Sequence, residues 1–151
     1  MKLRIEIDPD GPEEVVIKAK AITESLQNLQ TKLERTLNAS GEIALKKGNE
    51  EFYLPYREIL YFETEGKSVT AYTKDEAFQT ALHLNELSLL LPKSFTRASK
   101  SCIVNTAKIC SIVRSPTGVS VARFSGSDSI LYISRKYYHV VREIIEETRL
   151  N

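Results

Sequence analysis

The chain has 151 residues, 42% of them hydrophobic and 27% charged, with a formal net charge of +1. These values are near the average for globular domains and exclude a disordered, collagen-like or coiled-coil protein. No run of about 18 apolar residues is present, so we expect no membrane insertion. The charged start of the chain lacks the apolar core of a secretion signal, so we expect a cytoplasmic protein with Cys102 and Cys110 as free thiols.

The charges are unevenly distributed. Residues 93–136 contain eight basic side chains against Asp128 alone, for a local charge of +7, whereas residues 41–92 carry −4. A basic segment in an otherwise neutral protein indicates a polyanionic partner. The alternative is a solvated surface with no binding role.

Residues 1–40 predict a strand, a second strand and a helix. Polar and apolar residues alternate over residues 2–7, a Pro- and Gly-containing turn follows, and residues 14–19 are rich in β-branched side chains. Thr23 is a suitable helix cap. The helix after it has a leucine stripe formed by Leu26, Leu29, Leu33 and Leu37. This unit is too small to be stable alone, so we expect it to pack on the rest of the chain, form a homodimer or bind an inhibitory protein.

From residue 41 onward, short apolar segments alternate with turns, which predicts a mainly-β (α+β) domain over residues 41–151. A short helix capped by Asn85 is expected up to residue 91. Ser134 is expected to cap a final helix with Val140, Val141, Ile144 and Ile145 on one face. The expected strands are 43–47, 51–54, 59–64, 68–73, 76–82, 109–114, 118–124 and 129–133.

The residues needed for catalysis do not form a recognisable pattern. His83 and His139 are the only histidines and lack the spacing of metal ligands. No phosphate-binding glycine loop is present, and the acidic pairs are sequence neighbours whose side chains diverge. We therefore expect no enzyme, no cofactor and no metal.

Three short segments place basic residues next to hydroxyl donors at expected turns. Such side chains suit phosphate oxygens and base edges. At the start of the final helix, a phosphate could also meet the helix amides. The candidate DNA-binding residues are Lys67 and Ser68; Arg97, Ser99, Lys100 and Ser101; and Ser134, Arg135 and Lys136.

The same segments resemble the LytTR DNA-binding domain family. Residues 95–109, FTRASKSCIVNTAKI, resemble its central motif of Phe, Arg, Ser, Ile/Leu-Val-Asn and Ile. Residues 58–63 resemble its strand with an aromatic pair, and residues 133–137 resemble its final Val-Ser-Arg-Arg-Tyr. One departure is Ser99, where members often have a His, so base readout by that turn can differ.

The resemblance implies an elongated fold of packed antiparallel sheets. It also implies a stand-alone bacterial transcriptional regulator that inserts loops into successive major grooves of duplex DNA, at direct or inverted promoter repeats, and bends it. By their chemistry, Arg97, Ser101 and Arg135 would contact phosphates, while Lys100, Lys136 and Ser99 would contact bases. Asn105 would be structural, because a buried Asn needs partners.

The main alternative is a mainly-β interaction module whose basic face binds an acidic protein. RNA binding is a weaker alternative, because single-strand readers need exposed stacking aromatics. The basic segment contains only Phe95, Phe124 and Tyr132, all expected in the core.

Overall fold

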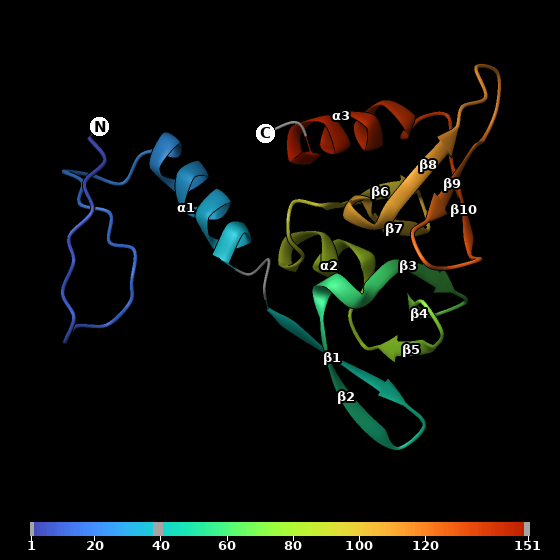
Figure 1. Ribbon diagram of the computed structural model, residues 1–151, viewed down its shortest axis with the longest axis horizontal. Coiled ribbons are helices and arrows are strands. Elements are labelled where there is room, and N and C mark those ends of the chain that lie inside the picture. Colours follow the sequence, from blue (N-terminus) through green and yellow to red (C-terminus); the bar gives the residue numbers. More distant parts are fainter. Residues whose placement is uncertain (1, 38–40, 150–151) are drawn as a thin grey trace.

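The computed structural model describes residues 2–37 and 41–149. Figure 1 shows a first helix, α1 (Glu24–Leu37), preceding a body of strands with further helices. The helix expected after Thr23 is confirmed, since Thr23 Oγ1 accepts a hydrogen bond from the Leu26 N–H at 3.1 Å. Leu26, Leu29 and Leu33 are half-buried. The Leu37 side chain and the expected boundary near Ser40 lie outside the described residues.

The two strands predicted before α1 are wrong, because residues 2–22 contain no strand. An antiparallel hairpin that matches Ile5 with Ile17 would bring like charges together. In that register Arg4 lies opposite Lys18, and directly opposed like charges destabilise a strand pair. A two-stranded hairpin with no packed face is also marginal in water. The turn chemistry and alternation are therefore not sufficient for a strand pair within one chain.

The body of the protein contains a seven-stranded and a three-stranded sheet, both antiparallel. The larger sheet has the order β2-β1-β5-β4-β3-β7-β6 and the smaller one the order β10-β9-β8. The strands are β1 (Glu42–Lys47), β2 (Glu50–Pro55), β3 (Ile59–Glu65), β4 (Ser68–Thr73), β5 (Ala77–Thr80), β6 (Phe95–Ser99), β7 (Cys102–Asn105), β8 (Ile109–Val113), β9 (Ser120–Phe124) and β10 (Ile130–Ile133). The mainly-β expectation is confirmed, and every predicted strand after residue 41 is found, with ends shifted by a few residues.

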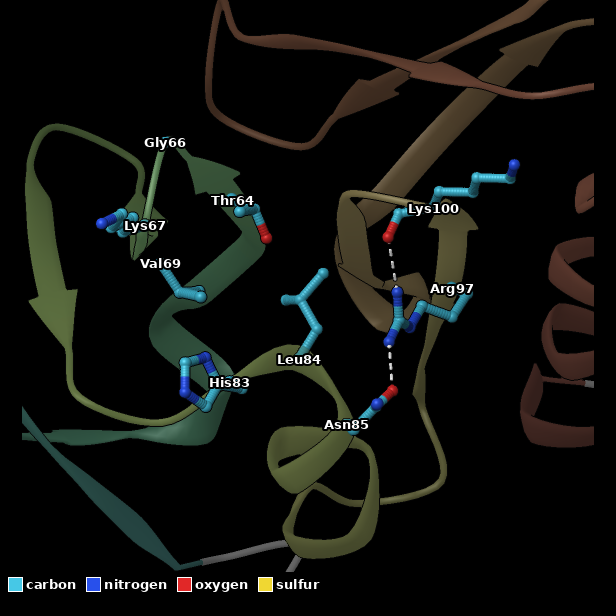
Figure 2. A pocket seen from close by; sticks show the side chains of 9 residues that line it. All are labelled: Thr64, Gly66, Lys67, Val69, His83, Leu84, Asn85, Arg97 and Lys100. Carbon is cyan, nitrogen blue, oxygen red and sulfur yellow. Dashed lines mark hydrogen bonds between the residues drawn. The ribbon is translucent and has the colours of Figure 1, made fainter.

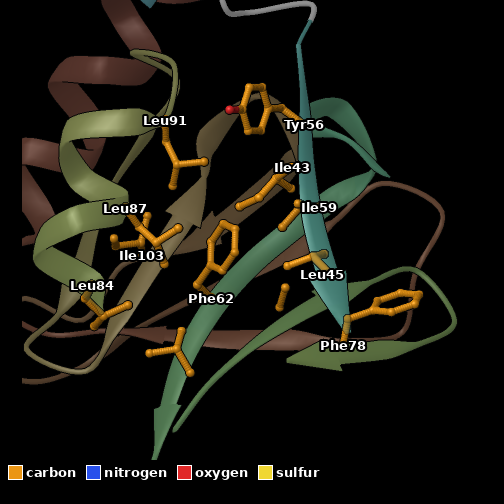
Figure 3. Packing of buried hydrophobic residues seen from close by; sticks show 12 residues of the cluster. Ile43, Leu45, Tyr56, Ile59, Phe62, Phe78, Leu84, Leu87, Leu91 and Ile103 are labelled. Carbon is orange, nitrogen blue, oxygen red and sulfur yellow. The ribbon is translucent and has the colours of Figure 1, made fainter. Parts of the chain in front are cut away.

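Two apolar cores lie on opposite faces of the larger sheet. On one face α2 (Leu84–Leu90) inserts Leu84 and Leu87 over β3 and β7, as Figure 3 shows. On the other face the smaller sheet and α3 (Tyr138–Arg149) pack through residues such as Phe124 and Val141. The interior strand β3 is buried on both faces and contributes Phe62 to the first core and Tyr61 to the second. These layers hold the turns at the ends of β3 and β7 on a rigid base.

The hairpin of β6 and β7 was not predicted. The sequence suggested a loop here, whereas Arg97 pairs with Ile103 and Thr96 pairs with Val104. All four residues of β7 are buried, so this strand shows no alternation of polar and apolar residues. The basic segment therefore begins as an edge strand of the larger sheet.

Both later helices begin at positions other than those predicted. Helix α2 has His83 as its N-cap instead of Asn85, and the His83 N–H donates to Glu86 Oε1 at 3.3 Å. Helix α3 begins at Tyr138, because residues 135–137 form a separate turn after Ser134. Val141 is fully buried in the second core, but Val140 is 42% exposed and does not share its face.

The C-terminal part of α3 is fastened to the body by ionic groups. Arg149 Nη2 donates to the carbonyl oxygens of Thr106, at 2.9 Å, and of Ile109. Lys93 Nζ lies 2.6 Å from Glu147 Oε2. None of the described helices is long and apolar enough to cross a membrane.

Candidate nucleic-acid interface

Two backbone hydrogen bonds bring the three candidate segments to one edge of the molecule. The Thr64 N–H, at the end of β3, donates to the Ser101 carbonyl at 2.8 Å. The Ser134 N–H, after β10, donates to the Ala98 carbonyl at 2.8 Å. The β6–β7 turn thus lies between the β3–β4 turn and the β10–α3 turn. We call these three turns the basic edge.

The β3–β4 turn is a tight two-residue loop of Gly66 and Lys67. Gly66 has φ of +64°, the positive value that the first position of a type II′ hairpin turn requires. Ser68 Oγ donates to the Glu65 carbonyl at 3.1 Å, which uses the Ser68 hydroxyl within the turn. Tyr72 donates its hydroxyl to Glu65, and this hydrogen bond raises the pKa of Tyr72. Only Lys67 extends from this turn as an exposed cation.

The β6–β7 turn carries Lys100 between two serines. The Ser101 N–H donates to Ser99 Oγ at 3.3 Å, and the two hydroxyl oxygens lie 3.4 Å apart. Lys100 is exposed, and Figure 2 shows its side chain extending away from the neighbouring pocket. The turn therefore presents one free ammonium group and two adjacent hydroxyls.

Arg97 holds this turn in place. Its Nη1 donates to the Lys100 carbonyl at 2.7 Å and its Nη2 to Asn85 Oδ1 at 2.8 Å, as the dashed lines in Figure 2 show. The guanidinium thus joins the β6–β7 turn to the start of α2. Two of the five guanidinium N–H donors of Arg97 are thus used within the protein. Only the remaining donors are available for the expected phosphate contact.

An open pocket of about 460 Å³ lies beside Arg97. Figure 2 shows Thr64 and Leu84 on its walls, with His83 below them. The pocket separates the β3–β4 turn from the β6–β7 turn, with Lys67 on one rim and Lys100 on the other. Within the described residues, no three His, Cys, Asp or Glu side chains are grouped to hold a metal ion.

The β10–α3 turn presents two exposed cations, Arg135 and Lys136. The Ser134 carbonyl accepts from the N–H groups of Tyr137 and Tyr138, at 3.0 and 3.1 Å. The two cations therefore precede the helix. The expectation that they lie in its first turn is wrong. Lys136 Nζ lies 5.7 Å from the centre of the Tyr137 ring.

Some residues near the basic edge were missed by the sequence analysis. Arg114, at the end of β8, lies with its guanidinium carbon 4.9 Å from the centre of the Tyr138 ring. This cation–π contact brings the β8–β9 loop beside the β10–α3 turn. Asn85 was interpreted as a helix cap but binds Arg97 instead. Residues 116–118, Pro-Thr-Gly, are a turn signal that the sequence shows close after Arg114. The sequence has no signal for the pairing of Asn85 with Arg97.

Two residues of β7 stiffen the base of the interface. Asn105 is buried, as predicted: its Nδ2 donates to the Ile59 carbonyl at 2.9 Å and its Oδ1 accepts from the Ala107 N–H at 3.2 Å. Burial raises the pKa of the Cys102 thiol, the nearby Glu63 raises it further, and Arg97 opposes the shift. Cys102 is therefore a neutral core side chain.

Comparison with known proteins finds relatives that are named as transcriptional regulators. The chain is 28% identical over 144 residues to an uncharacterized HTH-type transcriptional regulator of Staphylococcus aureus strain NCTC 8325, covering 95% of this chain and 97% of that protein. A counterpart in strain MSSA476 is 34% identical over 86 residues, which are 57% of this chain and 58% of the other. In the described part of this chain, no two helices are consecutive, so no helix-turn-helix is formed there.

A solved structure shares the fold. It is the LytTr DNA-binding domain of a protein described as a methyl-accepting/DNA response regulator from Bacillus cereus, with a TM-score of 0.64 and 23% identity. The match covers 70% of this chain and 96% of that domain. The chain therefore has the fold of that domain, and its class by fold is a mainly-β domain of packed antiparallel sheets.

The particular family follows from the sequence match. The model of the LytTr DNA-binding domain matches residues 49–146 of this chain. The chain belongs to the LytTr DNA-binding domain family, and the resemblance noted in its three motifs is confirmed.

Proposed function

We propose that the protein is a transcriptional regulator that binds duplex DNA by placing the turns of its basic edge in successive major grooves and bending the duplex. The pair of backbone hydrogen bonds that links the three turns is the observation on which this proposal rests. A major groove is about 12 Å wide and admits side chains from a two-stranded turn. The transcriptional role is supported by the names of the staphylococcal relatives.

The exposed cations at the basic edge are free to neutralise phosphates or read bases. The side chains of Lys67, Lys100 and Arg135 have no hydrogen-bond or ion-pair partner among the described residues. We assign Lys100 and Lys136 to base edges, where Lys prefers guanine O6 and N7, with Ser99 as a shorter donor. Arg135, Ser101 and Lys67 are assigned to phosphates, which set the register without reading sequence.

Arg97 has a modified role in this proposal. Its two internal hydrogen bonds keep Lys100 at a defined position, and its remaining N–H groups are available to a phosphate. Ser68 and Ser134 serve mainly to shape their turns, because the Ser68 hydroxyl and the Ser134 backbone groups are bonded within the protein.

The test is selection of random duplex DNA by the full chain at about 100 mM salt, followed by the same selection with the Lys100→Ala/Lys136→Ala variant. An enriched motif that this variant loses supports the assignment. Lys46→Ala/Lys74→Ala is the matched control, since it also removes two exposed cations, one on β1 and one after β4, outside the three turns of the basic edge. If about six phosphates are contacted, log affinity falls with log salt with a slope near −5. Absence of enrichment by a folded protein would contradict the proposal and favour an acidic protein partner.

A further inference from the structure

Residues 2–22 expose an unusual amount of apolar surface. Leu3, Ile5 and Ile7 are 96%, 82% and 88% exposed, and Val15 and Ile22 are also largely exposed. None of these side chains belongs to either core of the described body. Exposed apolar side chains gathered in one short segment indicate an interaction site.

The charged side chains of residues 2–8 are arranged with the periodicity of a strand. Arg4 Nη2 lies 2.6 Å from Glu6 Oε1, so these two side chains, two positions apart, share one face. That periodicity is the one of an extended strand, and it places the apolar side chains on the opposite face. The segment ends at Asp8, whose carbonyl accepts the Gly11 N–H at 3.2 Å and whose Oδ1 accepts the Asp10 N–H at 3.1 Å.

The charges of this segment are ordered so that it complements itself. Its first two charged residues, Lys2 and Arg4, are basic, and its last two, Glu6 and Asp8, are acidic. Antiparallel pairing with an identical segment therefore brings opposite charges together. Lys2 of one copy lies opposite Asp8 of the other, and Arg4 lies opposite Glu6, which are favourable cross-strand pairs.

The apolar face matches in the same register. Leu3 of one copy lies opposite Ile7 of the other, and Ile5 lies opposite Ile5 on the two-fold axis. A hairpin within one chain achieves only the apolar match, because it places Arg4 opposite Lys18. A second copy of this chain thus pairs opposite charges on one face of the segment and apolar side chains on the other. A hairpin within one chain does not achieve both.

We propose that residues 2–8 pair antiparallel with residues 2–8 of a second copy, forming a two-fold homodimer centred on Ile5. An interface of this kind is isologous, since the same surface is used by both copies. A two-stranded ribbon alone is marginal. The exposed Val15 and Ile22, together with the half-buried leucines of α1, provide further apolar surface in each copy for the dimer to bury.

Disulfide cross-linking of the full chain tests the register. In a Cys110→Ser background, which removes the exposed native thiol, the Ile5→Cys variant should form a covalent dimer on mild oxidation. Directly opposite residues have Cα atoms about 4.5–5.5 Å apart, within the range of a disulfide. The Leu3→Cys variant and the Ile7→Cys variant should each fail to cross-link alone. In the antiparallel dimer, the two copies of residue 3, or of residue 7, lie about 13 Å apart. An equimolar mixture of these two variants should cross-link.

Charge reversal gives an independent test by sedimentation velocity. Lys2→Glu/Arg4→Glu makes all four charges acidic, and Glu6→Lys/Asp8→Lys makes all four basic. Each variant should associate with itself about tenfold or more weakly than the natural chain, and an equimolar mixture of the two should recover the dimer. Lys46→Glu/Lys74→Glu is the control for the acidic variant. It changes the net charge of the chain by the same amount, at exposed sites of the body.

Circular dichroism is the control that checks whether each variant keeps the folded body. A chain that remains monomeric at every concentration overturns the proposal, as does equal cross-linking at all three cysteine positions. Failure of the charge-reversed mixture to associate also overturns it and would favour a different protein as the partner of residues 2–22. None of these outcomes depends on DNA, so they are separate from the test of the proposed function.

Discussion

The basic side chains of the C-terminal half occur in two different settings. In one setting the cation has a partner within the protein, as for Lys93, Arg97, Arg114 and Arg149. In the other, the cation is exposed and makes no hydrogen bond or ion pair in the described residues, as for Lys100, Arg135 and Lys136. All seven have the same sign of charge, yet the second group can meet a new anion without breaking a hydrogen bond or an ion pair, and the one contact at stake there is that of Lys136 with the Tyr137 ring.

This difference separates stability from binding. A cation with a partner holds a turn or a helix in place, and its removal leaves that partner unsatisfied. An exposed cation contributes little to folding, but its charge is available to a phosphate or a base. Net charge in the sequence therefore overstates the binding surface, and substitutions in the two groups should have different signatures.

The largest effect is expected for Lys100→Ala/Lys136→Ala. Loss of two base contacts should weaken binding to the selected DNA by about 2–6 kcal/mol, since each good contact discriminates by about 1–3 kcal/mol. The free energy of unfolding should change by less than about 0.5 kcal/mol. Fluorescence anisotropy on selected and random duplexes at one salt concentration measures the first effect. Equal losses on both duplexes would remove these residues as base readers.

Arg97→Ala should affect both folding and binding. Loss of the hydrogen bonds to the Lys100 carbonyl and Asn85 should lower the free energy of unfolding by about 2 kcal/mol. DNA binding should weaken on every sequence, because the phosphate contact of Arg97 is lost. It should weaken further on the selected duplex, because the turn that positions Lys100 loses its support. Arg97→Lys should not restore stability, since an ammonium group lacks the planar fork that reaches both acceptors. Urea denaturation and anisotropy measure the two effects, and Asn85→Ala, which removes one bond only, should give an intermediate loss of stability.

Arg149→Ala should have the opposite pattern to the double lysine variant. It removes hydrogen bonds to two backbone carbonyls that fasten the end of α3, at a cost of about 1 kcal/mol of unfolding free energy. DNA affinity should stay unchanged, because Arg149 is at the C-terminal end of α3, whereas the basic edge meets its start. Thermal melting together with anisotropy checks both statements. Weaker DNA binding at unchanged stability would instead assign Arg149 to the cations that are available to DNA.

The smallest effect concerns the two thiols, which repeat the contrast between a buried and an exposed group. Burial raises the pKa of Cys102, so near pH 8 this thiol should resist alkylation by iodoacetamide while the exposed Cys110 reacts. Above the ordinary thiol pKa of about 8.5, Cys102 ionises in the unfolded chain only. Stability should therefore fall slightly as pH rises through that range. Mass spectrometry of the native protein identifies the modified residue, and equal labelling of both would contradict the assignment.

The sequence predicted elements best where local chemistry determines them. Thr23 marked the start of α1, and the break between the expected strands 59–64 and 68–73 marked the β3–β4 hairpin, because capping and turn residues act through their immediate neighbours. The β6–β7 hairpin was missed because β7 is buried on both faces and shows no alternation. The strands in residues 2–19 were predicted from alternation, a turn and β-branched residues, but within one chain the opposed like charges disfavour their pairing.

The candidate site was predicted in pieces and not as a whole. All three basic turns were found, since Lys, Arg and Ser beside turn residues are visible in the sequence. Their proximity depends on hydrogen bonds between residues far apart in the chain, Thr64 with Ser101 and Ala98 with Ser134. The partner of Arg97 likewise comes from another element, at Asn85. Long-range pairing of this kind has no local signal.

The hydrogen bond from Ser134 to Ala98 also has a consequence for aggregation. Strand β6 is an edge of the larger sheet, and an uncovered edge can pair with another molecule and initiate uncontrolled polymerisation. The β10–α3 turn occupies one backbone acceptor of that edge, and α3 packs against the same strand. The opposite edge, β2, begins with Glu50 and Glu51 and ends with Pro55, residues that discourage strand addition. The turn that presents Arg135 and Lys136 thus also protects the sheet from joining its neighbours.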